Sequence, residues 1–542
     1  MNISNNNQKN ILDLPNEILF IIFKKLNMVD VLYSLVDVTQ RFDQIILNPL
    51  YICNLDMTTM TMKSCFEFIY SIDNKVLDRI CKTILHRIHH QVNELTVEQH
   101  SMERVLHTIN YPALHSLSFI DFQEDVLLKY LTDNTALRKL LTEQITSLQI
   151  DVMDKKTSPS LPRTLSTIFA FVLSLCKRLI KLSFCHLYHH LTNCTFDLSS
   201  TNCLSSTLTT LEITVKTFDD CLYLLDERLN CLSTLKIHVD EIAFTSGTID
   251  NTKILPKLKH FTFWSDPRTL VYDNQILPLF RRMINLEELI FFLSIIRIDS
   301  NYIDGIQLYD DILIYMRRLK KFVFNIDTCV IKKNIGIALS SNEDIQRSFI
   351  GREYGPVGTH VETFSGENKG RGHMYSLPHE FNGRCHIYSL PYQFKNFHYL
   401  SNSFQGGMFD NVHCLMMTDI RPFEHYFFKV ISQSFPLLKR LYIFNNEPQK
   451  EKQQPITFIK FSHLILLYLT SAHVDYAKQF LFNKHCHLPC LLDLYIRYES
   501  LAVVTNNFTN DGTRRTCDKL TSLHVKEPFV PPENFHQYFP LL

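Results

Sequence analysis

The sequence of 542 residues predicts an α/β protein, in which a short N-terminal group of three helices precedes a curved array of strand–helix repeats. Two observations lead to this fold class. Apolar residues recur at helical spacing near the N-terminus, and a strand-like pattern then returns about a dozen times along the remaining chain. A chain of this length is too long for one small core, so we expect either several domains or a repeat array that grows one unit at a time.

Three short helices are expected close to the N-terminus. The first begins near Asp13, because Pro15 suits a first helical turn and Glu17 suits the positive end of the helix dipole. Its apolar stripe consists of Ile18, Leu19, Ile22, Phe23 and Leu26. Asp30 can cap a second helix, and a third apolar set runs from Phe42 to Leu50. Such short helices cannot bury their apolar faces alone, so the module is expected to need a partner.

The same residues resemble the F-box family. The matching positions, in order and at the family's spacing, are Leu14-Pro15-x-Glu17-Ile18-Leu19, Ile22-Phe23-x-x-Leu26, Asp30-Val31, Val38, Arg41-Phe42 and Asn48-Pro49-Leu50-Tyr51. The resemblance covers only about 40 residues. Thr39 stands where the family usually has cysteine, and Phe42 and Tyr51 replace two usual tryptophans, which keeps aromatic packing.

The resemblance implies a three-helix F-box at residues 11–52 that docks on a Skp-type adaptor and, through it, on a cullin. The adaptor-binding residues that it implies are Leu14, Pro15, Glu17, Ile18, Leu19, Ile22, Phe23 and Leu26. Residues 1–10 are expected to be a disordered tail, and residues 53–90 a helical connector. The alternative is an ordinary amphipathic helix pair, because apolar stripes often indicate nothing more than a core.

Beyond residue 90 one pattern keeps returning: an apolar residue, two variable residues, leucine or phenylalanine, one variable residue and another apolar residue. It reads as a short strand. The segments are 92–97, 114–119, 145–150, 179–184, 208–213, 232–237, 258–263, 286–291, 319–324, 438–443, 464–469, 491–496 and 520–525, with weaker copies at 394–399 and 412–417.

Most steps between these segments are about 22 to 34 residues, which is close to the period of leucine-rich repeats. Amphipathic runs between them, such as 219–225 and 476–481, are expected to form outer helices. The pattern resembles leucine-rich repeats, and this resemblance implies a curved α/β solenoid over residues 91–542. A generic α/β domain with leucine-rich segments is the alternative.

Residues 350–384 interrupt the repeats. Over half of the 13 glycines in the chain fall in this segment. Dense glycine between apolar runs favours a loop or hairpin insertion, and such insertions often carry binding residues.

Strand alternation predicts a target-binding surface. The residue between the two inward positions, and the one after the second, should point to the open face of the sheet. In the second half of the chain these positions hold aromatic residues and arginine, which protein interfaces use as anchors. The residues singled out are Trp264, Phe292, Tyr442, Phe444, Tyr468, Tyr495 and Arg497. The alternative is that the insertion or a neighbouring loop covers them.

Composition points to protein partners. Lysine plus arginine equals aspartate plus glutamate at 55 each, so no global field favours nucleic acid or an anionic membrane. The N-terminus lacks the apolar core of a secretory signal, and no stretch is long and apolar enough for a membrane helix. Fifteen scattered cysteines, an odd number, fit a reducing compartment, so the chain is expected in the cytoplasm, the nucleus or both.

No pattern of an enzyme, cofactor or metal site is evident. The cysteine and histidine clusters at 185–194 and 485–490 lack paired Cys-x-x-Cys knuckles, so no metal is expected there. No sequence pattern nominates a nucleophile and its base. The resemblance therefore implies a non-catalytic substrate-recognition subunit of an SCF-type ubiquitin ligase. A non-degradative F-box scaffold is the first rival, and an enzyme hidden in the glycine-rich insertion is the second.

Overall fold

The computed structural model describes residues 11–62, 68–70, 72–133, 135–152, 163–185, 204–226, 228–244, 253–332, 338–352, 354–364, 370–371, 380–450 and 458–542. The fold is mixed α/β, and its largest element is a twelve-stranded, mostly parallel sheet. The chain divides into two compact units. Unit 1 comprises Met1–Thr61, Ile69–Glu241 and Thr245–Phe261, and unit 2 comprises Met62–Phe68, Ile242–Phe244 and Thr262–Leu542.

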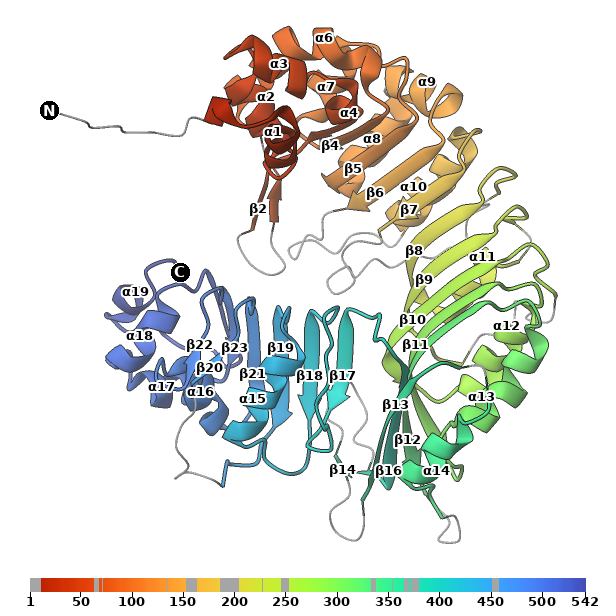
Figure 1. The fold of residues 1–542 in the computed structure, drawn as a ribbon, viewed down its shortest axis with the longest axis vertical. Coiled ribbons are helices and arrows are strands. Elements are labelled where there is room, and N and C mark those ends of the chain that lie inside the picture. The colour runs from red at the N-terminus through yellow and green to blue at the C-terminus, as the bar shows by residue number, and fades with distance from the viewer. Residues whose placement is uncertain are drawn as a thin grey trace, which may run out of the picture. The chain divides into compact units, whose positions relative to one another are not determined.

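Unit 1 begins with a module of short helices, here called the N-terminal module (residues 11–52). Its helices are η1 (Ile11–Asp13), α1 (Asn16–Phe23), α2 (Met28–Leu35), α3 (Gln40–Ile46) and α4 (Pro49–Ile52) (Figure 1). The first long helix therefore starts at Asn16 rather than at Asp13. The cap of α2 is Asn27, whose side chain accepts the backbone N–H of Val29 at 2.9 Å, and not Asp30.

The segment expected to be a helical connector is helical only in its second part. It begins with β1 (Asn54–Met57), which pairs in parallel with β4 (Glu94–Glu98). Leu55 and Met57 are buried, whereas Asn54 and Asp56 are exposed, which is the alternation of a strand. The remaining elements are β2 (Met60–Met62), β3 (Phe68–Tyr70), α5 (Asn74–Arg79), η2 (Ile80–Ile84), α6 (Leu85–Ile88) and η3 (His89–Gln91).

The strands of unit 1 follow the chain order β1-β4-β5-β6-β7-β8-β9. They continue from β4 with β5 (Ser116–Phe122), β6 (Ser147–Val152), β7 (Lys181–Phe184), β8 (Thr210–Thr217) and β9 (Thr234–Glu241). Between them lie α7 (Met102–Thr108), α8 (Glu124–Asp133), α9 (Thr135–Glu143), α10 (Arg163–Leu175) and α11 (Phe218–Leu224). Leucines at the same repeat position are neighbours across strands, as Leu182, Leu211 and Leu235 are.

The twelve-stranded sheet continues with β10 (His260–Thr269), β11 (Glu288–Ile298) and β12 (Lys321–Ile331). This part of it is called here the first sheet of unit 2. The glycine-rich segment then adds β13 (Val357–Thr363) and β16 (Gly383–Ser389), which pair with each other in antiparallel fashion, and β16 also pairs with β12. The other elements are η5 (Tyr272–Ile276), α12 (Leu277–Arg281), α13 (Gly305–Asp311), η6 (Leu313–Tyr315), α14 (Asn342–Ser348), β14 (Gly370–Arg371) and β15 (Glu380–Phe381).

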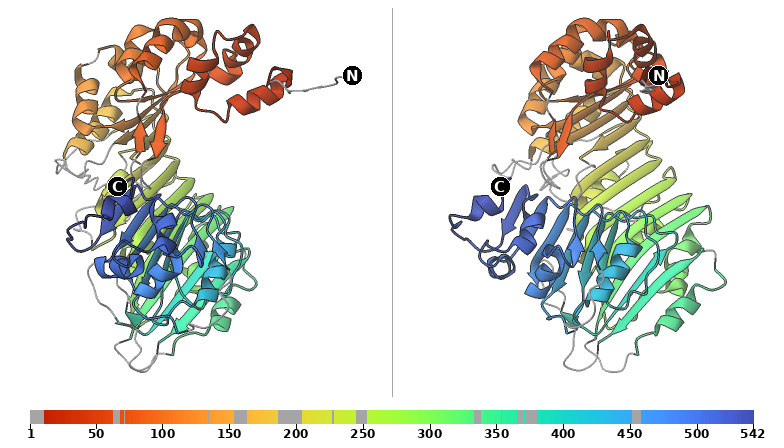
Figure 2. Two further views of the ribbon diagram at one scale, coloured as in Figure 1. Left: turned by 90° about the vertical axis from the view of Figure 1, so that its left-hand side faces the viewer. Right: turned by 60° about the vertical axis from the view of Figure 1, so that its left-hand side comes forward.

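The second sheet of unit 2 has the order β17-β18-β19-β21-β23-β24, and Figure 2 shows this part of the chain in cyan to blue. These strands are β17 (Asn396–Leu400), β18 (Cys414–Thr418), β19 (Arg440–Asn445), β21 (Leu466–Ala472), β23 (Asp493–Ile496) and β24 (Ser522–Val525). The other elements are α15 (His425–Ser434), β20 (Ile459–Lys460), α16 (Val474–Leu481), β22 (Cys486–His487), α17 (Tyr498–Thr505), α18 (Asp511–Cys517) and α19 (Phe535–Tyr538). Phe292 and Val323 of the first sheet share one hydrophobic core with the second sheet.

The strand positions predicted from the sequence are confirmed. At each predicted segment a strand begins two residues after the first apolar residue, as β11 does after Leu286 and β19 after Leu438. Both leucines are buried in the turn that precedes the strand. Apolar periodicity therefore located the strands, because each repeat buries the same positions.

In the part of the chain that the structure describes, no helix combines the length and apolar character needed to cross a membrane.

Candidate functional site

Helix α1 is apolar on two sides. Leu19 and Phe23 lie one helical turn apart and are buried, with exposed fractions of 0% and 1%. Ile18 and Ile21 lie on another side and keep 42% and 55% of their surface exposed. An exposed helix usually carries polar residues opposite its buried stripe. The N-terminal module therefore buries one apolar face of α1 and leaves a second one in solvent.

Two side chains from later helices hold α1 in place. The guanidinium of Arg41 donates hydrogen bonds to the carbonyl oxygens of Leu12 and Leu14, and to Oδ1 of Asn16 at 2.8 Å. The hydroxyl of Tyr51 donates to the carbonyl oxygen of Phe23 at 3.1 Å. These contacts fix both ends of α1, and therefore the direction in which its exposed face points.

The structure sorts the eight expected adaptor-binding residues by exposure. Pro15, Glu17, Ile18 and Leu26 are exposed, and Leu14 and Ile22 are half-buried. Leu19 and Phe23 are the exceptions, because they pack inside the module, where the Phe23 ring meets Phe42 edge-to-face at 5.4 Å. The expectation that these two side chains face a partner is wrong. Single-sequence periodicity could not tell the inner stripe from the outer one.

The N-terminal module is also anchored to the helices that follow it. Arg79 donates to the carbonyl oxygen of Tyr33 at 2.6 Å and of Val36 at 3.0 Å. Arg87 forms ion pairs with Asp37 at 2.8 Å and with Asp43 at 3.1 Å. The module is thus part of unit 1 rather than a separate body on a flexible link.

A second candidate surface is a row of aromatic rings on the second sheet of unit 2, here called the aromatic row (Tyr442, Tyr468, Tyr495 and His524). These residues are direct neighbours across β19, β21, β23 and β24, and all are half-buried. Ring centroids are 5.5 Å apart for Tyr442 and Tyr468, 5.5 Å for Tyr468 and Tyr495, and 4.1 Å for Tyr495 and His524. Parallel pairing places equivalent residues side by side, so one repeat position generates the whole row.

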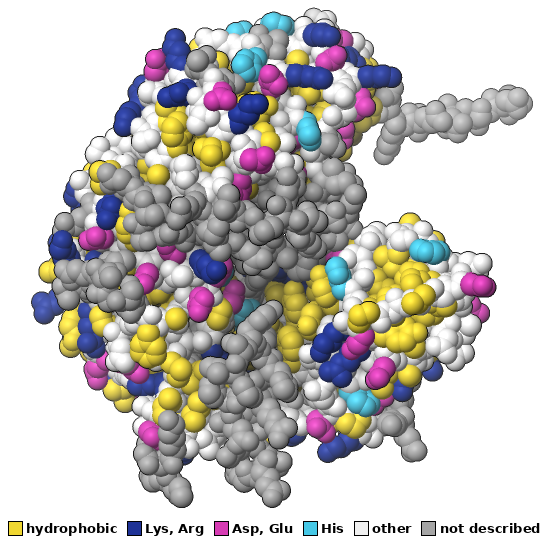
Figure 3. Space-filling view, turned by 180° about the vertical axis from the view of Figure 1, so that it is seen from behind, with side chains coloured by type: hydrophobic (Ala, Val, Ile, Leu, Met, Phe, Trp, Pro, Cys, Tyr) yellow, Lys and Arg dark blue, Asp and Glu magenta, His cyan; other side chains and the backbone are white. Residues whose placement is uncertain are grey.

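The other expected target-binding residues differ in exposure. Phe444 and Arg497 are half-buried, and Nε of Arg497 donates to the carbonyl oxygen of Thr470 at 2.7 Å. Figure 3 shows hydrophobic side chains gathered over the C-terminal part of unit 2, with basic side chains beside them. This part of the unit therefore offers apolar surface to solvent.

Trp264 and Phe292 do not form an open surface. Phe292 is completely buried, and Trp264 is half-buried and stacks on it with ring centroids 4.2 Å apart. Phe394 closes the pair from the side, with its ring 5.6 Å from Trp264. The expectation that Phe292 faces solvent is wrong, because the chain leading into β17 covers this part of the sheet.

Unit 2 also contains a buried ionic cluster, which no sequence pattern had indicated. Asp327 pairs with Nε of Arg384 and, at 3.3 Å, with Nη2 of Arg268. Arg384 also lies 3.8 Å from the carboxylate of Glu362, and Arg268 lies 4.0 Å from the ring centre of Tyr399. Burial alone would raise the pKa of Asp327, but Arg384 and Arg268 hold that pKa below its ordinary value.

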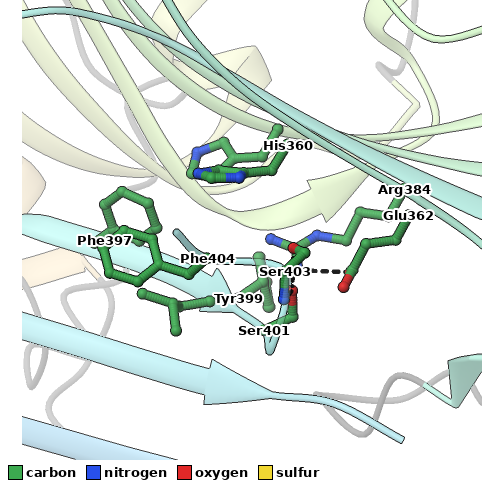
Figure 4. A pocket seen from close by; sticks show the side chains of 10 residues that line it. His360, Glu362, Arg384, Phe397, Tyr399, Ser401, Ser403 and Phe404 are labelled. Atoms are coloured by element: carbon green, nitrogen blue, oxygen red, sulfur yellow. Dashed lines mark hydrogen bonds and ion pairs between the residues drawn. The ribbon is translucent and has the colours of Figure 1, made fainter. Parts of the chain in front are cut away.

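A small pocket opens beside this cluster. Figure 4 shows His360, Glu362, Arg384 and Tyr399 around it. Burial, and then the charge of Arg384, lower the pKa of His360 from 6.5 to about 4. The pocket has room for about one water molecule, which is far too small for a metabolite or cofactor. The four charged side chains of the cluster belong to β10, β12, β13 and β16 of the first sheet, and Arg268 packs on Tyr399 of β17 in the second sheet.

No metal centre was found among the described side chains, where no group of three or more histidine, cysteine, aspartate or glutamate residues could hold an ion. Of the two clusters considered from sequence, residues 186–194 lie outside the described part. In the other cluster Cys486 is buried and Cys490 is exposed.

Comparison with known proteins assigns no family, because no family model matches the chain and no curated protein matches it significantly.

Proposed function

We propose that the chain is the substrate-recognition subunit of an SCF-type ubiquitin ligase. In this proposal the N-terminal module binds a Skp-type adaptor, which connects it to a cullin, and the repeats capture a target protein. Ubiquitin transfer is carried out by the partner subunits, and the complex acts in the cytoplasm, the nucleus or both. The observation that carries the proposal is the exposed apolar face of α1 at Ile18 and Ile21.

That face supports adaptor docking because Ile18 and Ile21 keep about half of their apolar surface in water. The core already contains Leu19 and Phe23. Docking would remove the remaining apolar surface from water, at about 25 cal/mol per Å² buried. Arg41, which belongs to the F-box-like pattern, holds the start of α1 and so preorganises the face.

The strands support a leucine-rich-repeat-like receptor. Each repeat places its strand at the same position, and parallel neighbours keep the same register from Leu148 through Leu182 to Leu211. Each strand therefore adds equivalent outward positions to one face, which is how repeat proteins build extended binding surfaces. The aromatic row is the part of this face best suited to protein recognition, because tyrosine is enriched among interface anchors.

The link between module and repeats supports a positioning role. Arg79 and Arg87 attach the N-terminal module to α5 and α6, which lead directly into β4. A receptor that presents its target to a separate catalytic subunit benefits from such a firm connection.

The proposal is tested by co-expressing the full chain with a Skp-type adaptor and measuring co-elution on a sizing column. The parent chain should co-elute, and the variant Ile18→Glu/Ile21→Glu should not, because two charges would have to be buried in the interface. The matched control is Ile180→Glu, which changes an isoleucine of unit 1 that is 49% exposed and lies outside the module. Circular dichroism should report the same helix content for all three proteins.

Failure of the parent chain to co-elute would reject the ligase function. Co-elution of the double variant would show that the adaptor does not bind at Ile18 and Ile21 of α1. The rival reading is a non-degradative F-box scaffold. It predicts that the abundance of a captured protein does not change when the chain is depleted, whereas a ligase subunit predicts that it rises.

A further inference from the structure

We propose that the aromatic row binds an acidic, extended segment of the captured protein. This inference rests on the proposed function, because it names the chemical class that the repeats recognise. It follows from three features of the second sheet: the orientation of the rings, the charges beside them and the length of the row.

The two inner rings of the row, Tyr468 and Tyr495, have a neighbouring ring on each side and so expose their edges rather than their faces. Tyr468 lies between Tyr442 and Tyr495, with interplanar angles of 34° and 28°, and Tyr495 stacks on His524 at 16°. A ring whose two faces are covered by neighbours can offer only its edge and its hydroxyl group to a ligand. The edge of an aromatic ring is electropositive, whereas its face is electronegative. The inner part of the row therefore suits carboxylate oxygens better than a lysine or arginine side chain, which needs a ring face.

Basic side chains flank the row on the same face of the sheet. Arg497 follows Tyr495 by two residues and Lys526 follows His524 by two, so strand alternation places each beside its ring. The N–H of Lys526 donates to the carbonyl oxygen of Ile496 at 3.1 Å, so the pairing of β23 and β24 extends to these residues.

The opposite flank of the row is also basic. Arg440 precedes Tyr442 by two residues and is half-buried on the same face. Asp493 is the acidic residue at the equivalent position of β23, and it is 1% exposed. Arg497 and the exposed Lys526 therefore place positive charge at the β23–β24 end of the row, which complements an acidic segment.

The row also has the length of a short peptide. Neighbouring strands lie about 4.8 Å apart, so four strands span roughly 14 Å. An extended segment of about four or five residues covers the same distance. Side chains on one side of an extended ligand are about 6.8 Å apart, so a ligand crossing the strands can place two or three carboxylates along the row.

The test uses the purified full chain without an adaptor and follows fluorescence anisotropy of labelled decapeptides. The acidic probe alternates glutamate and glycine, and the matched probes carry glutamine or lysine in place of glutamate. The acidic probe should bind at least about tenfold more tightly than the glutamine probe, and this difference should shrink as salt screens the charges.

Variants locate the binding on the row. We expect the affinity for the acidic probe to fall by about tenfold or more in Lys526→Glu, which changes an exposed side chain. The same loss or a larger one is expected in Arg497→Glu/Lys526→Glu. Tyr468→Leu keeps apolar bulk but removes the ring edge and the hydroxyl group, so it should lower the affinity for the acidic probe roughly fivefold. The matched control is Arg317→Glu/Arg318→Glu, two exposed arginines of the same unit outside the second sheet, and it should bind like the parent chain.

Equal binding of the acidic and glutamine probes, tighter binding of the lysine probe, or an equal loss in the Arg317/Arg318 control would each overturn the inference. No adaptor is present, so the result is independent of the co-elution experiment. If the chain binds the acidic probe but no adaptor, the inferred binding site stands and the proposed ligase function is rejected.

Discussion

Arg384 lies against Asp327 in the interior of unit 2, and neither side chain reaches solvent to any useful extent, with 9% and 2% of their surfaces exposed. The two residues come from neighbouring strands, β12 and β16, that are separated by the glycine-rich segment in sequence. Pairing of these strands therefore brings the two charges together within the first sheet, where the neighbouring Arg268 also packs on Tyr399 of the second sheet.

Removal of one member of this pair should destabilise unit 2 strongly. Asp327→Ala leaves Arg384 and Arg268 buried without their carboxylate, and we expect a loss of roughly 3–5 kcal/mol in the free energy of unfolding. Urea denaturation followed by circular dichroism measures this loss. The matched control Asp344→Ala changes an exposed aspartate of α14 and should cost far less, because it removes only the capping-box partner of Ser341. Equal costs for the two variants would contradict a structural role for the ion pair.

Buried histidines should make unit 2 sensitive to mild acid. An unfolded histidine takes up its proton near pH 6.5, whereas His360 does so only near pH 4 because burial and Arg384 lower its pKa. Between these values the unfolded chain binds more protons than the folded one, so stability falls as pH falls. Burial also lowers the pKa of His386 and His398, which adds to the effect. Asp327 does not contribute in this window, because its pKa lies below 3.8 and its stabilising effect is lost only at lower pH.

The measurement is the melting temperature between pH 7.5 and pH 5. The parent chain should lose stability across this range, and His360→Gln should lose less, because glutamine takes up no proton in the unfolded chain. His463→Gln changes an exposed histidine of the same unit and should follow the parent curve. Identical curves for His360→Gln and the parent would show that this histidine is not responsible.

The two sides of α1 should respond differently to truncation. Phe23 is 1% exposed and packs on Phe42, so Phe23→Ala should cost about 3–5 kcal/mol. Ile18 is 42% exposed, so Ile18→Ala should stay within roughly 0.5 kcal/mol while still weakening adaptor binding. Denaturant unfolding and adaptor titration together separate the two effects. A large stability loss at Ile18 would mean that this face belongs to the core.

The positions of the strands could be predicted from the sequence, but not which other segments cover their side chains. The repeat pattern placed β11 and β19 correctly, because each strand must bury the same positions against its neighbours. It could not reveal that Phe394 closes over Trp264, since that contact joins residues 130 positions apart in the chain. The ionic cluster could not be predicted for the same reason. Arg384, Asp327 and Glu362 share no local motif and meet only through antiparallel strand pairing.

Trp264 is the single tryptophan of the chain, so its fluorescence reports on the packing of one point in unit 2. It stacks on Phe292 with an interplanar angle of 1°, and Phe292 has no exposed surface. Phe292→Ala should therefore cost about 3–5 kcal/mol and shift the tryptophan emission to longer wavelength, as water reaches the uncovered indole. The control Phe458→Ala removes a ring that is 59% exposed, and it should change neither stability nor emission. If Phe292→Ala instead left stability and emission as in the parent chain, the Phe292 ring would face solvent. The first sheet would then again be a candidate surface for binding the target protein.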